Sequence, residues 1–248
     1  MVIRRVHAGW TAESDPDAGK YAIYPVSSTN VLVDDCFAFN SADAGIYVGQ
    51  ATGCVVRNSR ATGNVAGIEI ENSVGCEVYE NTATDNTGGI LIFELPGLPM
   101  TGRGTLVRDN VVTGNNRENF ADPGAIVGLV PTGSGLVILA AHDVEIRDNE
   151  FSDNRSLAVV ILSYATILEL EMSPAPEGYD PFISGIYVHD NTFSNNGQMP
   201  GTRIEGQPDA LLELLGAIEL FAMETITTIE DVVFDGFLPP GADTTEVC

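Results

Sequence analysis

Short runs of alternating apolar and polar residues recur along the chain at a constant spacing. Gly45-Ile46-Tyr47-Val48, Gly67-Ile68-Glu69-Ile70 and Gly89-Ile90-Leu91-Ile92 begin at residues 45, 67 and 89, which are 22 residues apart. The segments that begin at Cys54 and Cys76 repeat at the same interval. Period-two alternation between Asn- and Gly-rich turns is typical of short strands, so each copy predicts two or three strands without a helix.

Aligning the copies on their central aliphatic residue extends the repeat over most of the chain. The centres are Ile3, Val33, Val56, Val78, Val107, Ile146, Val188 and Val233. Asn residues recur at constant offsets, as in Asn81, Asn110 and Asn149. A strand triplet in every copy predicts an all-β fold, a single-stranded right-handed parallel β-helix (solenoid) of about eight coils, because each coil can pair with its neighbours. The recurring Asn side chains are expected to stack as ladders.

The copies move apart toward the C-terminus, which predicts long loops on the later coils. Residues 209–224 instead follow helical spacing and predict a short amphipathic helix that caps the final coil, with a partner-binding helix as the alternative. We predict one β-helix domain over residues 1–248. Because repeat sequence begins directly after Met1, we expect further coils to precede this segment and the first coil to expose an edge that can associate.

Four segments carry a resemblance to a known family. Residues 30–36, 43–50, 64–72 and 86–93, which read NVLVDDC, DAGIYVGQ, NVAGIEIEN and NTGGILIF, resemble bacterial parallel β-helix repeat-containing proteins. More broadly, they are similar to the pectate-lyase-like superfamily of polysaccharide lyases, epimerases and glycoside hydrolases. The resemblance implies export, to a secreted, periplasmic or cell-surface location, and association with carbohydrate. It determines no reaction.

The charge of the chain narrows the possible partners. Asp and Glu number 35 against 11 Lys and Arg, for a net charge of −24. Such a field repels nucleic acid and anionic lipid surfaces. No apolar run approaches the roughly 18 residues that a membrane span needs. The resemblance to the pectate-lyase-like superfamily makes a polysaccharide or other glycan the expected partner.

The residue after each central aliphatic should face outward, and these positions form a column rich in Arg. The column includes Arg57, Tyr79, Arg108 and Arg147 and predicts a groove for an acidic polysaccharide. The alternative, which we favour, is local pairing of the Arg side chains with the acidic column beside it. Asp109, Asp148 and Asp190 in that acidic column could also hold Ca²⁺, the one cofactor that the pattern allows.

A second outward column follows the repeat Gly. It contains Tyr24, Tyr47 and Glu69, with Glu71 close by. Tyrosine rings beside carboxylates are typical of a glycan contact surface. Packing beneath a loop is an equal alternative for these residues.

The candidate catalytic residues are Tyr179, Asp180 and His189. Tyr179-Asp180-Pro181 resembles part of the Tyr/Asp-Pro-His cluster of mannuronan epimerases, although Phe182 stands where that motif has His. The resemblance implies a base for a polyuronate lyase or C5-epimerase. A turn-forming Asp-Pro is the alternative.

Cys54 and Cys76 occupy equivalent inward positions on adjacent coils, where we expect stacked reduced thiols in preference to a disulfide.

The sequence leaves three hypotheses about function open. The first is an exported, carbohydrate-associated β-helix that binds or processes an acidic polysaccharide. The second is a non-catalytic structural or interaction module of a larger secreted protein. The third is a polyuronate lyase or epimerase.

Overall fold

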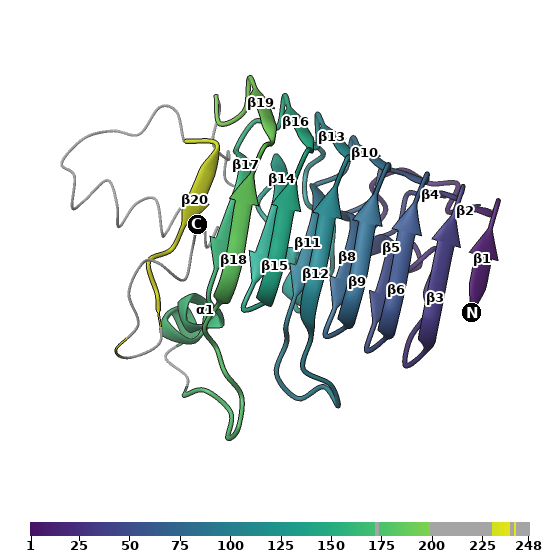
Figure 1. The fold of residues 1–248 in the computed structure, drawn as a ribbon. Coiled ribbons are helices and arrows are strands. Elements are labelled where there is room, and N and C mark those ends of the chain that lie inside the picture. The colour runs from purple at the N-terminus through teal and green to yellow at the C-terminus, as the bar shows by residue number, and fades with distance from the viewer. Residues whose placement is uncertain (172–173, 199–229, 239–240, 242–248) are drawn as a thin grey trace.

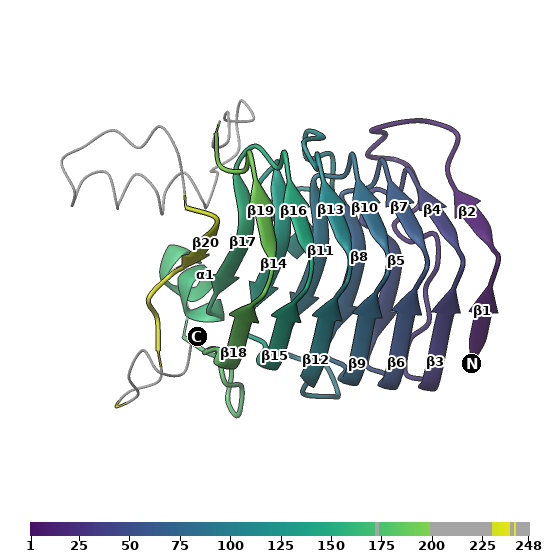
Figure 2. The ribbon, with the colours of Figure 1, turned by 45° about the horizontal axis from the view of Figure 1, so that its top comes forward.

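The computed structural model describes residues 1–171, 174–198, 230–238 and 241, and these wind into a parallel β-helix. Three parallel sheets run along the molecule (Figures 1 and 2). Each coil contributes one strand to each sheet, except that the first coil meets the third sheet only through isolated bridges at Ile23 and Val26. No helix among the described residues is long and apolar enough to cross a membrane.

We call the first sheet sheet A. Its strands are β1 (Val2–Arg4), β3 (Thr29–Asp34), β6 (Thr52–Arg57), β9 (Val74–Tyr79), β12 (Arg103–Arg108), β15 (His142–Arg147) and β18 (Ser184–His189). Their register aligns the predicted central residues, for example Val33 with Val56 and Val78. The seven strands mark seven coils in the described part of the chain.

Sheet B follows sheet A in every coil after a sharp corner. Its strands are β2 (His7–Gly9), β4 (Phe37–Phe39), β7 (Arg60–Thr62), β10 (Thr82–Thr84), β13 (Val111–Thr113), β16 (Glu150–Ser152) and β19 (Thr192–Ser194). One corner residue per coil has a positive φ, and these are Arg5, Asp35, Asn58, Glu80, Asp109, Asp148 and Asp190. Asn and Asp tolerate this left-handed conformation better than most residues, which explains why the column is polar and largely acidic.

Sheet C completes each coil. Its strands are β5 (Ala44–Gly49), β8 (Ala66–Glu71), β11 (Gly88–Phe93), β14 (Ser134–Leu139), β17 (Leu157–Leu162) and β20 (Val232–Phe234). The alignment of Val233 as the centre of an eighth copy is wrong, because Val233 pairs with Val160 in sheet C and belongs to the seventh coil. A short alternating segment looks alike in any of the three sheets, so the pattern could not distinguish them.

The predicted Asn ladders are confirmed. The Asn86 side-chain amide donates to Asn115 Oδ1 at 2.9 Å, and Asn115 continues the ladder to Asn154 at 3.1 Å. A second ladder joins Asn110 to Asn149 at 2.9 Å. These buried amides satisfy the backbone at the turns, where sheet pairing ends.

Cys54 and Cys76 form a disulfide with a Cα–Cα distance of 4.4 Å, so the expectation of reduced thiols is wrong. The two residues are direct cross-strand partners on β6 and β9. This register brings their Cα atoms within the range that a disulfide needs.

Sheet C differs from the other sheets because both of its faces are buried. Every residue of β5, β8, β11 and β14 is buried, whereas β6 and β9 alternate. A second apolar cluster, separate from the interior core, joins its outer face to Tyr21, to the 3₁₀ turn η1 (Ile126–Leu129) and to α1 (Tyr164–Glu171). The sequence analysis did not predict α1. The helix that it predicted over 209–224 lies outside the described residues.

Candidate functional site

The outer face of sheet A carries the predicted Arg column in register. Arg57, Tyr79, Arg108 and Arg147 are successive cross-strand neighbours on β6, β9, β12 and β15, and His189 follows on β18. The Arg108 guanidinium lies 4.0 Å from the centre of the Tyr79 ring. The structure therefore brings the five side chains into one column.

The Arg side chains of this column are paired with carboxylates. Arg57 Nε lies 3.1 Å from Asp34 Oδ1. Arg108 Nη1 lies 2.7 Å from Asp109 Oδ2, and Arg147 Nη1 lies 2.6 Å from Asp148 Oδ2. The pairs of Arg108 and Arg147 confirm local pairing with the neighbouring acidic column, whereas Arg57 pairs with Asp34 of its own column. An acidic ligand would have to displace carboxylates already bound there.

The three candidate metal ligands are occupied in the same way. Asp109 and Asp148 pair with Arg108 and Arg147, and Asp190 Oδ2 lies 2.8 Å from His189 Nδ1. In the part of the chain that the structure describes, no group of three His, Cys, Asp or Glu side chains has a geometry suited to a metal ion. The geometry gives Ca²⁺ no support at these positions.

The candidate catalytic residues are divided between two ends of sheet A. The Tyr179 hydroxyl donates to the Glu94 carbonyl at 2.7 Å, and the Glu94 carboxylate accepts from Gly102 N just before β12 begins. His189 lies at the opposite end of the sheet, as the last residue of β18. Because a six-residue strand spans about 16 Å, the structure does not bring Tyr179 and His189 together. Asp180 Oδ1 accepts from Phe182 N at 3.1 Å, which confirms a turn at Asp180.

A different set of side chains gathers on the outer face of sheet C. Tyr47 on β5 is the cross-strand partner of Glu69 on β8, and Glu71 lies two residues further along β8. Asp43 immediately precedes β5, and the segment that bridges Ile23 to Ile46 brings in two more tyrosines. We call this set the tyrosine–carboxylate cluster, and it consists of Tyr21, Tyr24, Asp43, Tyr47, Glu69 and Glu71.

The three tyrosine rings of the cluster touch one another. Tyr21 and Tyr24 stack with centroids 4.3 Å apart at 15°, and the Tyr24 and Tyr47 centroids are 4.9 Å apart. Tyr47 is buried, whereas Tyr24 is 52% exposed. The packing interpretation therefore holds for Tyr47, and Tyr24 leaves an aromatic ring open to solvent.

The three carboxylates of the cluster are buried beside these rings. Glu71 Oε1 accepts from the Tyr47 hydroxyl and, at 3.2 Å, from the Gln50 amide. Glu69 is only 1% exposed, and its Oε2 has no hydrogen-bond partner. Among the described residues, no Lys, Arg or His forms an ion pair with any of the three.

Burial changes the protonation of these carboxyl groups. Burial raises the pKa of Asp43 to about 6, although a hydrogen bond from Tyr21 and the charge of Lys20 oppose it. Burial also raises the pKa of Glu71. The pKa of Glu69 lies well above its usual range because of burial, with the charges of Asp43 and Glu71 adding to the effect. The cluster therefore retains protons at pH values where exposed carboxylates have lost them.

Sequence reasoning identified Tyr24, Tyr47, Glu69 and Glu71 but missed Asp43 and Tyr21. Asp43 stands two residues before the repeat Gly, where the next two copies have Val65 and Thr87. An acidic residue in that otherwise uncharged column was the available signal. Tyr21 precedes the first full copy and carried no comparable signal.

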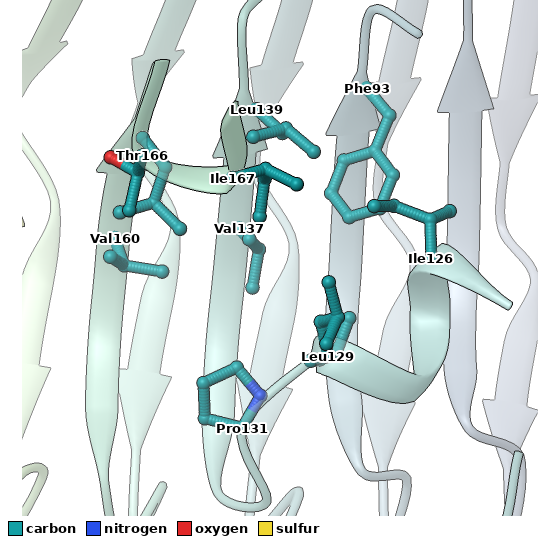
Figure 3. A pocket seen from close by; sticks show the side chains of 11 residues that line it. Phe93, Ile126, Leu129, Pro131, Val137, Leu139, Val160, Thr166 and Ile167 are labelled. Atoms are coloured by element: carbon teal, nitrogen blue, oxygen red, sulfur yellow. The ribbon is translucent and has the colours of Figure 1, made fainter. Parts of the chain in front are cut away.

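A small apolar pocket lies further along the outer face of sheet C, between η1 and α1 (Figure 3). It has a volume of about 40 Å³ and is lined by residues such as Phe93, Leu129 and Ile167. None of its lining side chains is titratable. The pocket therefore adds packing space but no acid–base chemistry.

Comparison with known proteins places this fold in a class. The chain belongs to the family described as right-handed β-helix region, whose model matches residues 17–213. The winding is therefore right-handed, as the sequence predicted. No curated protein matches the chain.

Two solved structures share the fold. A periplasmic alginate epimerase, AlgG, is 15% identical, with a TM-score of 0.51 over 79% of this chain and 43% of that one. The A-module of the mannuronan C-5 epimerase AlgE4 from Azotobacter vinelandii is 17% identical, with a TM-score of 0.52 over 84% of this chain and 56% of that one. This chain thus spans about half the length of each.

Proposed function

We propose that this chain is a carbohydrate-binding β-helix protein that holds a glycan at the tyrosine–carboxylate cluster. The observation that carries the proposal is the half-exposed Tyr24 ring, stacked on Tyr21 and next to three buried carboxylates. Aromatic rings pack against the apolar faces of sugar rings. Carboxylate oxygens accept hydrogen bonds from sugar hydroxyls.

The same cluster also contains a carboxyl group that could act as an acid or base on the bound glycan. A carboxyl group whose pKa is raised to about 6, as at Asp43, can hold and give up a proton near neutral pH. One structural neighbour is an alginate epimerase by name and the other a mannuronan C-5 epimerase, which supports a glycan partner for this chain. Binding is the main proposal, and turnover is its extension.

An acidic polysaccharide along sheet A is the second candidate. Tyr187 is 50% exposed and stacks on His189 with centroids 4.1 Å apart, which adds an aromatic surface at the end of the Arg column. The ion pairs of Arg108 and Arg147 weigh against it, because a polyuronate would have to replace Asp109 and Asp148.

We also propose that the protein works in an oxidising compartment. The buried Cys54–Cys76 disulfide supports a secreted, periplasmic or cell-surface location.

The two exposed tyrosines form a matched pair for testing the site. We expect Tyr24→Ala to lower glycan affinity by roughly tenfold, since a stacked aromatic contributes about 1 kcal/mol or more to binding. Tyr187→Ala should leave affinity unchanged. The measurement is binding of both variants and the wild type to an array of neutral, acidic and amino glycans.

Each other outcome selects a different function. If Tyr187→Ala and Arg108→Ala/Arg147→Ala lose polyuronate binding while Tyr24→Ala binds as well as wild type, the glycan site lies on sheet A. If no variant and no wild-type protein binds any glycan, the hypothesis of a non-catalytic structural or interaction module is favoured. Unsaturated or epimerised products from alginate or pectin would instead support a lyase or epimerase.

A further inference from the structure

We infer that the tyrosine–carboxylate cluster recognises an ammonium group, so that its ligand is a glycan built from amino sugars with free amines. This inference rests on the proposed function and names its substrate class. It is carried by three buried carboxylates and three adjoining tyrosine rings. Among the residues that the structure describes, the three carboxylates have no ion-pair partner and Glu69 Oε2 has no hydrogen-bond partner.

Once they are ionised, the three carboxyl groups of the cluster need a cation to balance their negative charge. The charge of Glu71 raises the pKa of Asp43, and the charges of Asp43 and Glu71 raise the pKa of Glu69, so the three groups lie close together. Lys20, the one lysine of the chain, influences Asp43 but forms no ion pair with it. Sugar hydroxyls would bond to these carboxylates without neutralising them. An ammonium group would do both, because it combines a positive charge with three donors.

Glu69 provides an independent indication. Its side chain is essentially inaccessible, and its Oε2 accepts no hydrogen bond. A buried carboxylate oxygen without a donor is unfavourable, and such atoms in native proteins often mark the site of a bound ligand or ion. Glu69 lies between Tyr47 and Leu91 on the outer face of sheet C, on the side where the tyrosines gather. A cation bound at the cluster would favour the ionised form of Glu69 and supply its counter-charge.

The aromatic rings strengthen the case for a cation. The Tyr47 centroid is 4.8 Å from that of Tyr21 and 4.9 Å from that of Tyr24. Ring faces attract cations, and aromatic groups combined with carboxylates are a common means of binding ammonium ligands. A uronate would meet the opposite situation, since its carboxylate would be repelled by three acidic groups. The cluster therefore selects for amino sugars and against uronates.

Binding of an ammonium group should also release protons. The unliganded cluster retains protons because Asp43, Glu69 and Glu71 have raised pKa values. A bound cation favours their ionised forms, so protons leave as the ligand enters. The titratable groups that face this event are the three carboxyls, Tyr47 on β5, Glu94 just after β11, and Lys20, Tyr21 and Tyr24 on the covering segment.

The experiment compares two ligands that differ in one charge. Oligomers of β-1,4-linked glucosamine and of N-acetylglucosamine are titrated calorimetrically into the intact chain at pH 6.5, in two buffers with different ionisation enthalpies. We expect the free-amine oligomer to bind at least roughly tenfold more tightly, as a desolvated cation–carboxylate contact allows. Its apparent enthalpy should change between buffers in the direction of proton release.

Variants assign the effect to the cluster. Glu69→Gln and Glu71→Gln should each lose most of the difference between the two oligomers, whereas Tyr24→Ala should weaken both. Glu150→Gln, an exposed substitution on sheet B, should behave as wild type. Equal binding of the two oligomers, or binding confined to other glycans, would overturn the inference and leave the proposed function standing. Absence of binding to every glycan would remove the proposed function as well.

Discussion

Glu69 shows how one residue can set the behaviour of a site. It occupies an outward position on β8, and its cross-strand partners in the same column are Tyr47 and Leu91. Under the covering segments this position becomes a buried, partly unsatisfied carboxyl group. The local sequence Gly67-Ile68-Glu69-Ile70 favours a strand but does not reveal the burial of its polar side chain.

The raised pKa of the buried Glu69 predicts that this group makes the protein less stable as pH rises. Because the pKa of Glu69 is higher folded than unfolded, the unfolded chain loses its proton first as pH rises. The contribution of this group to stability therefore falls with increasing pH above about 4.5, the usual value for Glu. We expect Glu69→Gln to be more stable than wild type at pH 8 and to lose that advantage near pH 4, as measured by thermal unfolding.

A matched control separates this effect from the loss of a charge in a very acidic protein. Glu150→Gln also removes one negative charge but on an exposed position of sheet B. Its melting temperature should follow that of wild type at both pH values. A Glu69→Gln variant that is less stable than wild type at pH 8 would contradict the buried-carboxyl interpretation.

Among the elements, the strands of sheet C are distinguished by what covers them. Strands of sheets A and C both alternate in sequence, and both place large aliphatic residues on their outer faces. On β11 the outward Leu91 is fully buried, whereas on β12 the outward Leu106 remains half-buried. The difference comes from the long connections, which pack η1 and α1 against sheet C.

This difference predicts unequal effects for two similar substitutions. We expect Leu91→Ala to lower the free energy of unfolding by about 3 kcal/mol, because it leaves a cavity between the sheet and its cover. Leu106→Ala should cost less than about 1 kcal/mol, since its side chain buries less area. Urea unfolding of the two variants measures both values. Equal losses would show that the cover contributes nothing at Leu91.

At the scale of the whole molecule, the coils form a linear stack in which each coil contacts its neighbours. The Asn ladders and the stacked aliphatic core run through this stack and tie the coils together. The disulfide adds a covalent bond between the third and fourth coils, in strands β6 and β9. It closes a loop with a sequence separation of 22 residues.

Reduction of this disulfide should weaken the whole stack. Closing a loop of this length removes unfolded-state entropy worth about 3 kcal/mol. We expect a reductant to lower the midpoint of urea unfolding for the wild type and to leave the Cys54→Ala/Cys76→Ala variant unchanged. A midpoint that reductant does not move in the wild type would mean that the coils are equally stable without the bond.

The sequence by itself determined the solenoid, its ladders and the sheet A centres of the coils from Ile3 to Val188. The centres Val33, Val56 and Val78 follow one another at 23 and 22 residues, and Asn64 and Asn86 are also 22 residues apart. Stacked coils account for this repeat, which continues across the longer insertions between later coils. The sequence also identified four members of the tyrosine–carboxylate cluster, with Tyr24, Tyr47 and Glu69 as outward residues of one column and Glu71 close by.

Only the tertiary structure decided which outward columns are covered and which side chains meet. Tyr47 and Glu69 are buried because segments distant in sequence pack over sheet C, and a period-two pattern is the same with or without that cover. The assignment of Val233 to sheet C and the bond between Cys54 and Cys76 likewise depend on distances in space. Asp43 became part of a site for the same reason, since its neighbours Tyr21 and Glu71 come from other parts of the coil stack.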